Sequence, residues 1–159
     1  MRDDVIYPKA PPREVAAEVD EPYKSDYLEA AAVLDISLKA SAAISRRLLE
    51  RILQEKYGIH RNSLAAEIDG FLGLPGIPSH LSEAIDAVRN VGNIAAHPIK
   101  DLRPGEVVDV ERGEAEWLLE VLEALFDFTF VQPKRLQVRR EQLNLKLRVL
   151  GKPEMKSER

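Results

Sequence analysis

The segment between Ser37 and Gly58 carries apolar residues every three or four positions, the period of one face of an α-helix. Serine is a favoured N-cap, and glycine often ends a helix in the left-handed conformation. No stretch longer than Val107–Val110 has a strand pattern, so we predict an all-α chain. The apolar residues of the segment are Leu38, Ala42, Leu48, Leu49, Ile52, Leu53 and Tyr57.

Four further segments show the same period and predict a bundle of about five helices. The first is expected to start with Ser25 or Asp26 as its N-cap, and the second with Asn62 or Ser63. The third opens at Ser79 and the fourth runs from Glu114 to about Val131, where Pro133 stops or restarts it.

The chain divides into three predicted parts. Residues 1–22 are polar and hold four prolines, which indicates an extended N-terminal arm, and residues 23–131 form the bundle. Residues 132–159 form a basic C-terminal helix or tail, with nine Lys or Arg against three acids, whereas the remainder has 14 basic and 24 acidic residues. Such a tail could bind nucleic acid, its own acidic body or a partner, or serve only solubility. Its leucines at helical spacing are Leu136, Leu143, Leu147 and Leu150.

Composition excludes several classes of protein. The absence of cysteine rules out disulfides, thiol nucleophiles and zinc–thiolate sites. No apolar run approaches the ~18 residues of a membrane span, and the N-terminus has no signal-peptide core, so we expect no membrane association and a cytoplasmic location. His60 and His80 lack a third clustered ligand, so we predict neither a metal nor a cofactor.

Residues 89–97 concentrate more chemistry than any other stretch. On a helix, Arg89, Asn93 and His97 would fall within an arc of about 80°, with Asn90 about 20° from the histidine. An arginine can grip two phosphate oxygens, an imidazole can transfer a proton near neutral pH, and an amide can orient a 2′-hydroxyl. These are the groups that RNA cleavage without a metal needs.

Plainer interpretations remain open for the same residues. Gly92-Asn93 could be a helix C-cap, with Arg89 solvated and His97 in a loop before Pro98. Other cations could bind nucleic acid: Arg46 and Arg47 in the long helix, and Arg139 and Arg140 in the basic tail. For Arg46 and Arg47 the alternative is an ion pair with Glu50 or with an acid on a neighbouring helix.

Four short motifs follow one another in an order that resembles the bacterial family catalogued as domain of unknown function 4145. They are Tyr7-Pro8-Lys9, Tyr27-Leu28-Glu29-Ala30-Ala31, Arg46-Arg47-Leu48-Leu49-Glu50, and Arg89…Gly92-Asn93…Ala96-His97. That family is placed in the HEPN superfamily of helical bundles. The resemblance covers roughly residues 7–131 and leaves the basic tail outside.

The resemblance implies a HEPN-like bundle and a homodimer. Many active HEPN proteins are metal-independent endoribonucleases whose two Arg-polar-His motifs face each other across the dimer. Carried over here, Arg89 is the motif arginine, Asn90 the polar residue and His97 the histidine, at a gap one residue longer than the motif usually has. We therefore expect a protein that binds or cleaves RNA in defence or stress. The alternative is a non-catalytic interaction module that supports a restriction or toxin–antitoxin effector.

Overall fold

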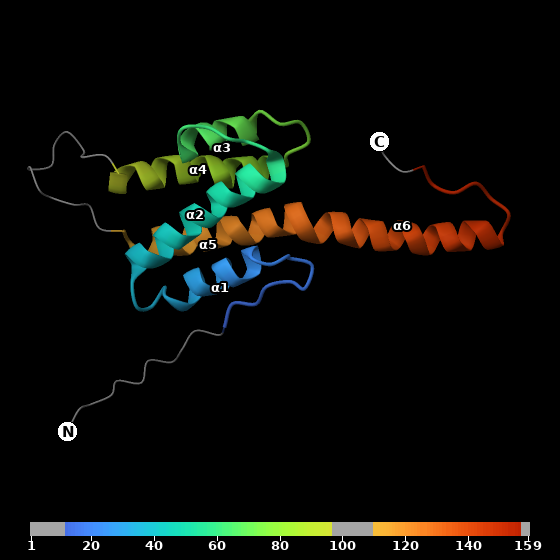
Figure 1. Ribbon diagram of the computed structural model, residues 1–159, viewed down its shortest axis with the longest axis horizontal. Coiled ribbons are helices and arrows are strands. Elements are labelled where there is room, and N and C mark those ends of the chain that lie inside the picture. The colour runs from blue at the N-terminus through green and yellow to red at the C-terminus, as the bar shows by residue number, and fades with distance from the viewer. Residues whose placement is uncertain (1–11, 97–109, 157–159) are drawn as a thin grey trace, which may run out of the picture.

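The computed structural model describes residues 12–96 and 110–156, and within them the predicted all-α class is confirmed (Figure 1). No β-strand occurs in these two ranges. Val107 to Asp109 of the predicted extended piece lie outside the described residues. The elements are α1 (Tyr23–Ala32), α2 (Leu38–Tyr57), α3 (Leu64–Leu72), α4 (Ser79–Ala96), α5 (Arg112–Phe126), the π-helical turn η1 (Asp127–Val131) and α6 (Gln132–Val149).

The predicted ends of the long helix are confirmed. The Ser37 side chain accepts a hydrogen bond from the Ala40 N–H at 3.1 Å, and Gly58 closes α2 at φ +65°. Ser63 caps α3 in the same way, through the Ala66 N–H at 3.2 Å. These caps satisfy backbone groups that a helix end otherwise leaves unpaired.

The predicted N-cap of the first helix was wrong by three or four residues, because α1 begins at Tyr23 with Pro22 as its N-cap. Ser25 does not act as its N-cap. Instead, the Glu21 carboxylate accepts hydrogen bonds from both the Ser25 N–H at 3.2 Å and the Ser25 hydroxyl at 2.5 Å. A carboxylate near the first turn is a favourable partner for unpaired N–H groups, so it replaces the expected serine cap.

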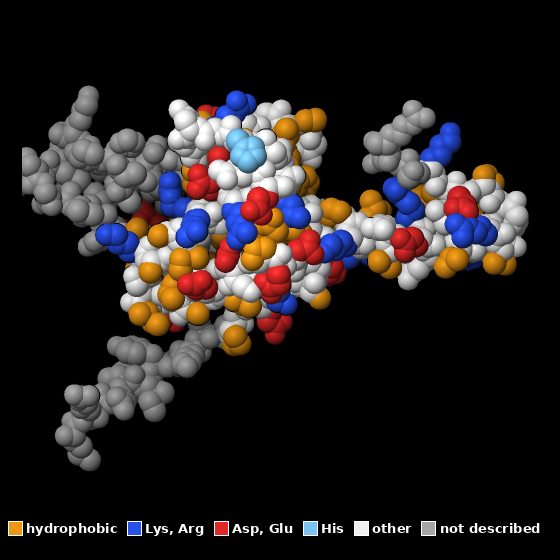
Figure 2. Space-filling view, viewed as in Figure 1, with side chains coloured by type: hydrophobic (Ala, Val, Ile, Leu, Met, Phe, Trp, Pro, Cys, Tyr) orange, Lys and Arg blue, Asp and Glu red, His pale blue; other side chains and the backbone are white. Residues whose placement is uncertain are grey.

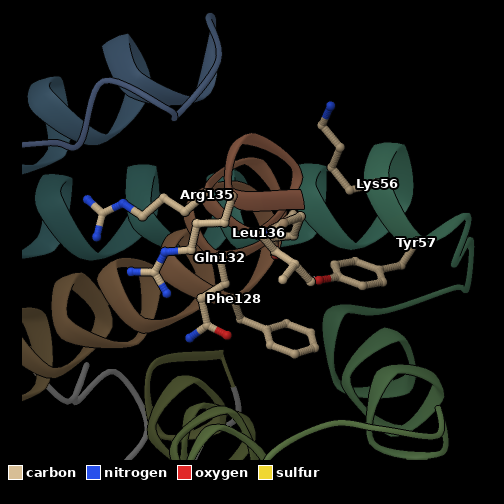
Figure 3. A pocket seen from close by; sticks show the side chains of 9 residues that line it. Lys56, Tyr57, Phe128, Gln132, Arg135 and Leu136 are labelled. Carbon is tan, nitrogen blue, oxygen red and sulfur yellow. The ribbon is translucent and has the colours of Figure 1, made fainter. Parts of the chain in front are cut away.

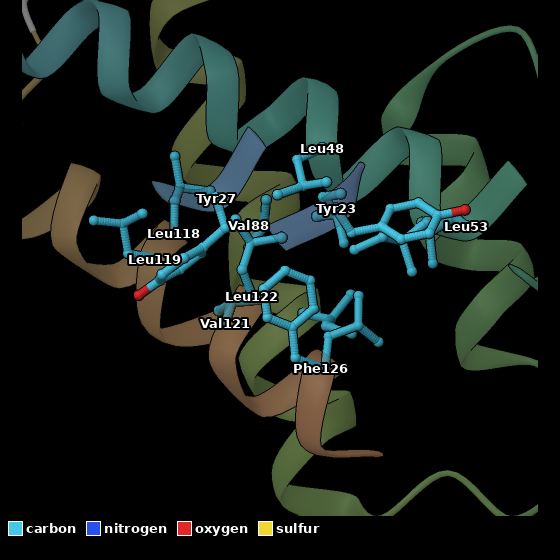
Figure 4. Close-up of a cluster of buried hydrophobic side chains, with 14 of the residues drawn as sticks. Tyr23, Tyr27, Leu48, Leu53, Val88, Leu118, Leu119, Val121, Leu122 and Phe126 are labelled. Carbon is cyan, nitrogen blue, oxygen red and sulfur yellow. The ribbon is translucent and has the colours of Figure 1, made fainter. Parts of the chain in front are cut away.

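The core forms where α2 packs against α1, α3 and α5, while α4 packs against α3 and α5. Figure 4 shows side chains from α1, α2, α4 and α5 meeting in one cluster. The Tyr27 ring lies edge-on to Phe126, with centroids 5.5 Å apart, and its hydroxyl donates to Glu123 at the surface. The largest fully buried side chains are Tyr27, Phe71, Leu48, Leu49, Ile52, Leu53, Ile68, Leu81, Ile85, Leu119, Leu122 and Leu125.

Residues 12–22, the described part of the predicted arm, lie against the bundle and the start of α6. Val19 is buried, and the Lys134 ammonium donates to Asp20 Oδ1 and to the Glu18 carbonyl, both at 2.6 Å. Arg135 Nε donates to the Glu18 carboxylate at 3.0 Å. We call these contacts of Glu18 and Asp20 with Lys134 and Arg135 the clasp.

Helix α6 continues the line of α5 and extends beyond the bundle (Figure 1). Pro133 does not stop the helix. Proline lacks an N–H and its ring clashes with the carbonyl four residues earlier, and a π turn, with bonds spanning five residues, relieves both problems. Here the Gln132 N–H donates to the Asp127 carbonyl. Along α6, whose residues are all described, none is buried.

Candidate functional site

Arg89, the predicted phosphate-binding arginine, lies on α4 with its side chain about one third exposed (32%). Its guanidinium donates through Nη1 to Asp69 on α3 and through Nη2 to Asp86, one turn earlier on α4. Two carboxylates therefore flank one guanidinium, and the local charge is negative. A phosphate that binds there would compete with these carboxylates for the guanidinium and would have to overcome their repulsion.

The helix that carries this motif is continuous. Because α4 runs to Ala96, the alternative that placed a helix C-cap at Gly92-Asn93 was wrong. The backbone of Asn90 and Asn93 is therefore helical. Their side chains and all of His97 lie outside what the structure describes, so the convergence of these groups with Arg89 stays a prediction.

The two arginines of α2 differ in exposure. Arg46 is half-buried, and its Nη1 atom has no hydrogen-bond partner among the described residues. Burial lowers the pKa of Arg46, while the nearby Glu50 opposes that shift. Arg47 is exposed and lines a hollow of about 480 Å³ shared with Asp26, Glu29 and Glu50. Within the described ranges, neither arginine forms the ion pair considered from the sequence.

The two arginines of α6 lie on adjacent positions of the projecting helix. Arg139 is exposed and has no acidic partner in the part of the chain that the structure describes. Arg140 is half-buried, and its Nε has no hydrogen-bond partner among those residues. Of these predicted nucleic-acid-binding residues, Arg139 is therefore the exposed, unpaired cation of α6.

A cavity of about 770 Å³, not anticipated from the sequence, lies where α6 leaves the bundle (Figure 3). We call it the π-turn cavity. Its walls come from the end of α2, from η1 and from the first turns of α6. Periodicity assigned its η1 residues to a regular helix, so the widened turn that forms the cavity left no signal. The lining residues are Lys56, Tyr57, Phe128, Thr129, Gln132, Pro133, Arg135, Leu136 and Arg139.

The apolar side chains of α6 form two seams. One follows the predicted leucines and has alternating steps of four and three residues when Arg140 is included, which is the spacing of a coiled-coil seam. The other lies on the opposite side of the helix, about 180–220° around the axis from Leu136. Figure 2 shows apolar side chains on the projecting part of the molecule. The first seam is Leu136, Arg140, Leu143, Leu147 and Leu150, and the second is Val138, Leu145 and Val149.

Several of these seam residues are strongly exposed. Leu136 is 57% exposed, Leu145 60% and Val149 87%. Short exposed apolar stretches are ordinary on protein surfaces, but two leucine-bearing seams on a projecting helix form a larger apolar surface. Such a surface is typical of a helix that packs against other elements on two sides.

The fold and its surfaces define a helical-bundle domain whose last helix projects from the body. The chain belongs to the family described as "Domain of unknown function (DUF4145)", whose model matches residues 28–146. The resemblance was expected over roughly residues 7–131, whereas the family model matches from residue 28 and extends through most of α6. No curated protein and no solved structure matches the chain.

Two further findings concern the described residues only. Among them, no group of three or more His, Asp or Glu side chains is arranged to hold a metal ion. None of their helices combines the length and the apolar character that crossing a membrane requires.

Proposed function

We propose that this chain is a non-catalytic interaction module that binds a partner protein through α6. The observation that carries the proposal is the exposure of α6: it is 18 residues long, none of them buried, yet it presents two apolar seams. Burying an exposed leucine side chain completely contributes roughly 1.5–3 kcal/mol. A partner that covers one seam would gain several such contributions.

The charge of α6 indicates what kind of surface would receive it. Residues 132–149 carry six Lys or Arg against Glu141 alone. Pairing α6 with a second α6 would therefore bring like charges together, whereas an apolar groove with an acidic rim would complement both the seam and the charge. The proposed partner presents such a groove. A restriction or toxin–antitoxin effector is the kind of partner that the HEPN resemblance suggests.

The contacts of Arg89 also favour a non-catalytic role. A catalytic arginine has to be free to bind a phosphate, and electrostatic stabilisation depends on donors aimed at the developing charge. Here two of the five N–H groups of Arg89, one on Nη1 and one on Nη2, already donate to Asp69 and Asp86. This ion-pair cluster joins α3 to α4, so its simplest role is to hold these two helices together.

A second candidate function is HEPN-like RNA binding or RNA cleavage in defence or stress, by a cytoplasmic homodimer. Its support is the unpaired Arg139 on a basic helix and the continuity of α4 through Asn93. In this alternative the α4 motifs of two copies would face each other. His97 would move the proton, and Arg89 would exchange a carboxylate for the phosphate.

The two candidates are separated by paired variants of the full-length protein. Leu143→Gln/Leu150→Gln disrupts one seam without changing charge, and Gln137→Ala is the matched control on the same helix but off both seams. In cross-linking experiments read by mass spectrometry, we expect the seam variant to lose a cross-linked partner that the wild type and the control retain.

RNA assays test the second candidate function, RNA cleavage or RNA binding. Cleavage of a structured RNA pool in EDTA, leaving 2′,3′-cyclic phosphate ends and abolished by Arg89→Ala and by His97→Ala, would establish the ribonuclease instead. RNA binding without cleavage, lost in Arg139→Gln/Arg140→Gln and kept in the seam variant, would favour an RNA-binding module. A phosphate-binding surface of this kind would also weaken as salt increases.

A further inference from the structure

We propose that the π-turn cavity binds a small organic monoanion with a flat apolar body, such as an aromatic carboxylate or sulfonate. The cavity volume of about 770 Å³ lies within the range of small-molecule sites, roughly 300–1,000 Å³. The cavity shares Leu136 with the first seam of α6, but its proposed ligand does not depend on the partner proposed for that seam.

The walls of the cavity suit an apolar body. Figure 3 shows Tyr57 reaching from α2 towards Leu136 on α6, with the ring of Phe128 beneath them. The two rings offer faces and edges against which a flat ring can pack. Leu136 is more than half exposed and closes the outer side. The ligand's ring would therefore lie between α2 and α6.

The uncharged polar side chains of the walls already have hydrogen-bond partners. The hydroxyls of Tyr57 and Thr129 hydrogen-bond each other at 2.7 Å. The Gln132 side chain donates to Asp127 Oδ2 at 2.6 Å. Burial raises the pKa of Tyr57, so this side chain stays neutral at physiological pH. A ligand body rich in hydrogen-bonding groups would find few partners here, whereas an apolar one would leave no group unpaired.

The charges at the rim set the charge of the ligand. The Lys56 ammonium lies over the rings of Tyr23 and Phe130, at 5.3 and 5.2 Å from their centroids, and 3.9 Å from Asp20. Arg135 is engaged in the clasp with Glu18.

Arg139 is the remaining cation of the rim, and no acid in the described ranges pairs with it. One unpaired guanidinium calls for one negative charge, which it can bind through two parallel hydrogen bonds. Pro133 alone accounts for the π turn, so the proposal rests on the cavity and its lining and not on the turn itself.

The test uses two probes with the same ring skeleton: 1-anilinonaphthalene-8-sulfonate, and N-phenyl-1-naphthylamine, which lacks the sulfonate group and is uncharged. We expect the full-length protein to bind one sulfonate probe per chain with enhanced, blue-shifted fluorescence. Arg139→Gln should weaken binding of the sulfonate probe about tenfold or more, because it removes a charge-assisted hydrogen bond, and should leave binding of the neutral probe unchanged. Lys146→Gln is the matched control, because it removes the same charge from α6 outside the cavity.

A second pair of variants tests the apolar wall. Leu136→Gln should weaken both probes, whereas Leu145→Gln, an equally exposed leucine on the other seam, should weaken neither. Thermal unfolding followed by circular dichroism confirms that all four variants fold. The proposal is overturned if the wild type binds no probe or binds several per chain. The proposal is also overturned if Arg139→Gln loses no more affinity for the sulfonate probe than Lys146→Gln, or if Leu136→Gln loses no more affinity for the probes than Leu145→Gln.

Discussion

Helices α5 and α6 belong to one continuous helical run and contain the same number of leucines, four each, yet they differ completely in burial. Seven of the 15 residues of α5 are buried, and none of the 18 residues of α6 is. In α5 the buried residues lie on one side of the helix, within an arc of about 160°. In α6, Leu145 lies opposite the other leucines.

The distribution of apolar residues around the axis therefore decides burial, and their number does not. A helix with one apolar face can bury it against one neighbouring layer, as α5 does against α1, α2 and α4. A helix with two opposite seams needs a neighbour on each side. Within the described chain, α6 has only the clasp at its start and the short segment after Val149 at its end.

The largest expected effect compares one leucine from each helix. Leu122→Ala removes a fully buried side chain of α5 and should lower the free energy of unfolding by about 2–5 kcal/mol. Leu145→Ala in α6 should change it by no more than about 0.5 kcal/mol, because that side chain is already 60% exposed. Urea unfolding of both variants measures the difference. A comparable loss in Leu145→Ala would mean that α6 is packed in solution, against a second copy or against the body.

A smaller effect is expected at the start of α2. Bundle helix α2 begins at a hydrogen-bonded cap, whereas α6 begins inside a continuous run with no side-chain cap. Ser37→Ala removes the acceptor of the Ala40 N–H and should cost about 0.5–2 kcal/mol in urea unfolding. Ser25→Ala is the control, since Ser25 is not a cap, and it should cost less. A larger loss of stability in Ser25→Ala than in Ser37→Ala would support Ser25 as an N-cap, as expected from the sequence.

The hydroxyl of Tyr27 joins α1 to α5 by donating to Glu123, which also binds Arg13 at 2.6 Å. Tyr27→Phe keeps the buried ring and removes this hydrogen bond, so we expect a loss of about 0.5–1.5 kcal/mol in thermal or urea unfolding. No hydrogen bond of this kind ties the exposed part of α6 to the bundle among the described residues. An unchanged stability would show that packing alone holds α1 against α5.

Local rules made the ends of α2 and the start of α3 predictable, because caps such as Ser37 and Ser63 act within one turn of their own helix. The start of α1 was missed because a glutamate carboxylate took the place of the expected serine. Leucine spacing predicted α6 as a helix. It could not show that the helix projects, since that depends on which surfaces the rest of the fold leaves open.

In the candidate site, too, some contacts were predictable from local helix geometry and others depend on how the helices pack. Asp86 lies three residues before Arg89, so its ion pair could have been expected from helix geometry alone. Asp69 comes from α3, and only the packing of α3 on α4 brings it to the same guanidinium. The π-turn cavity depends on Pro133, on the end of α2 and on the direction of α6 together, so no single segment predicts it. For Asn90, Asn93 and His97 the sequence prediction stands untested.

The smallest expected effect compares the two ends of α6. At the start, hydrogen bonds from Arg135 and Lys134 lower the pKa values of Glu18 and Asp20, respectively. At the far end, a hydrogen bond from Arg148 lowers the pKa of Glu154. A carboxylate with a lowered pKa adds stability above its ordinary pKa of about 4, and this stability is lost as the pH falls through the lowered value. For unfolding of the whole molecule only Glu18 and Asp20 should follow this rule, because they join α6 to residues 12–22, whereas Glu154 holds only the short segment after α6.

The test of that difference is urea unfolding of Glu18→Gln/Asp20→Asn and of Glu154→Gln, each compared with the wild type at pH 7 and near pH 3. The clasp variant should unfold at slightly lower urea at pH 7, and the difference should become smaller at the lower pH and in high salt, since these groups contact solvent. Glu154→Gln should match the wild type throughout, because breaking its pair releases only the short C-terminal segment. If Glu154→Gln destabilised the protein as much as the clasp variant, the end of α6 would be coupled to the bundle. In that case α6, like α5, would be packed as part of the bundle.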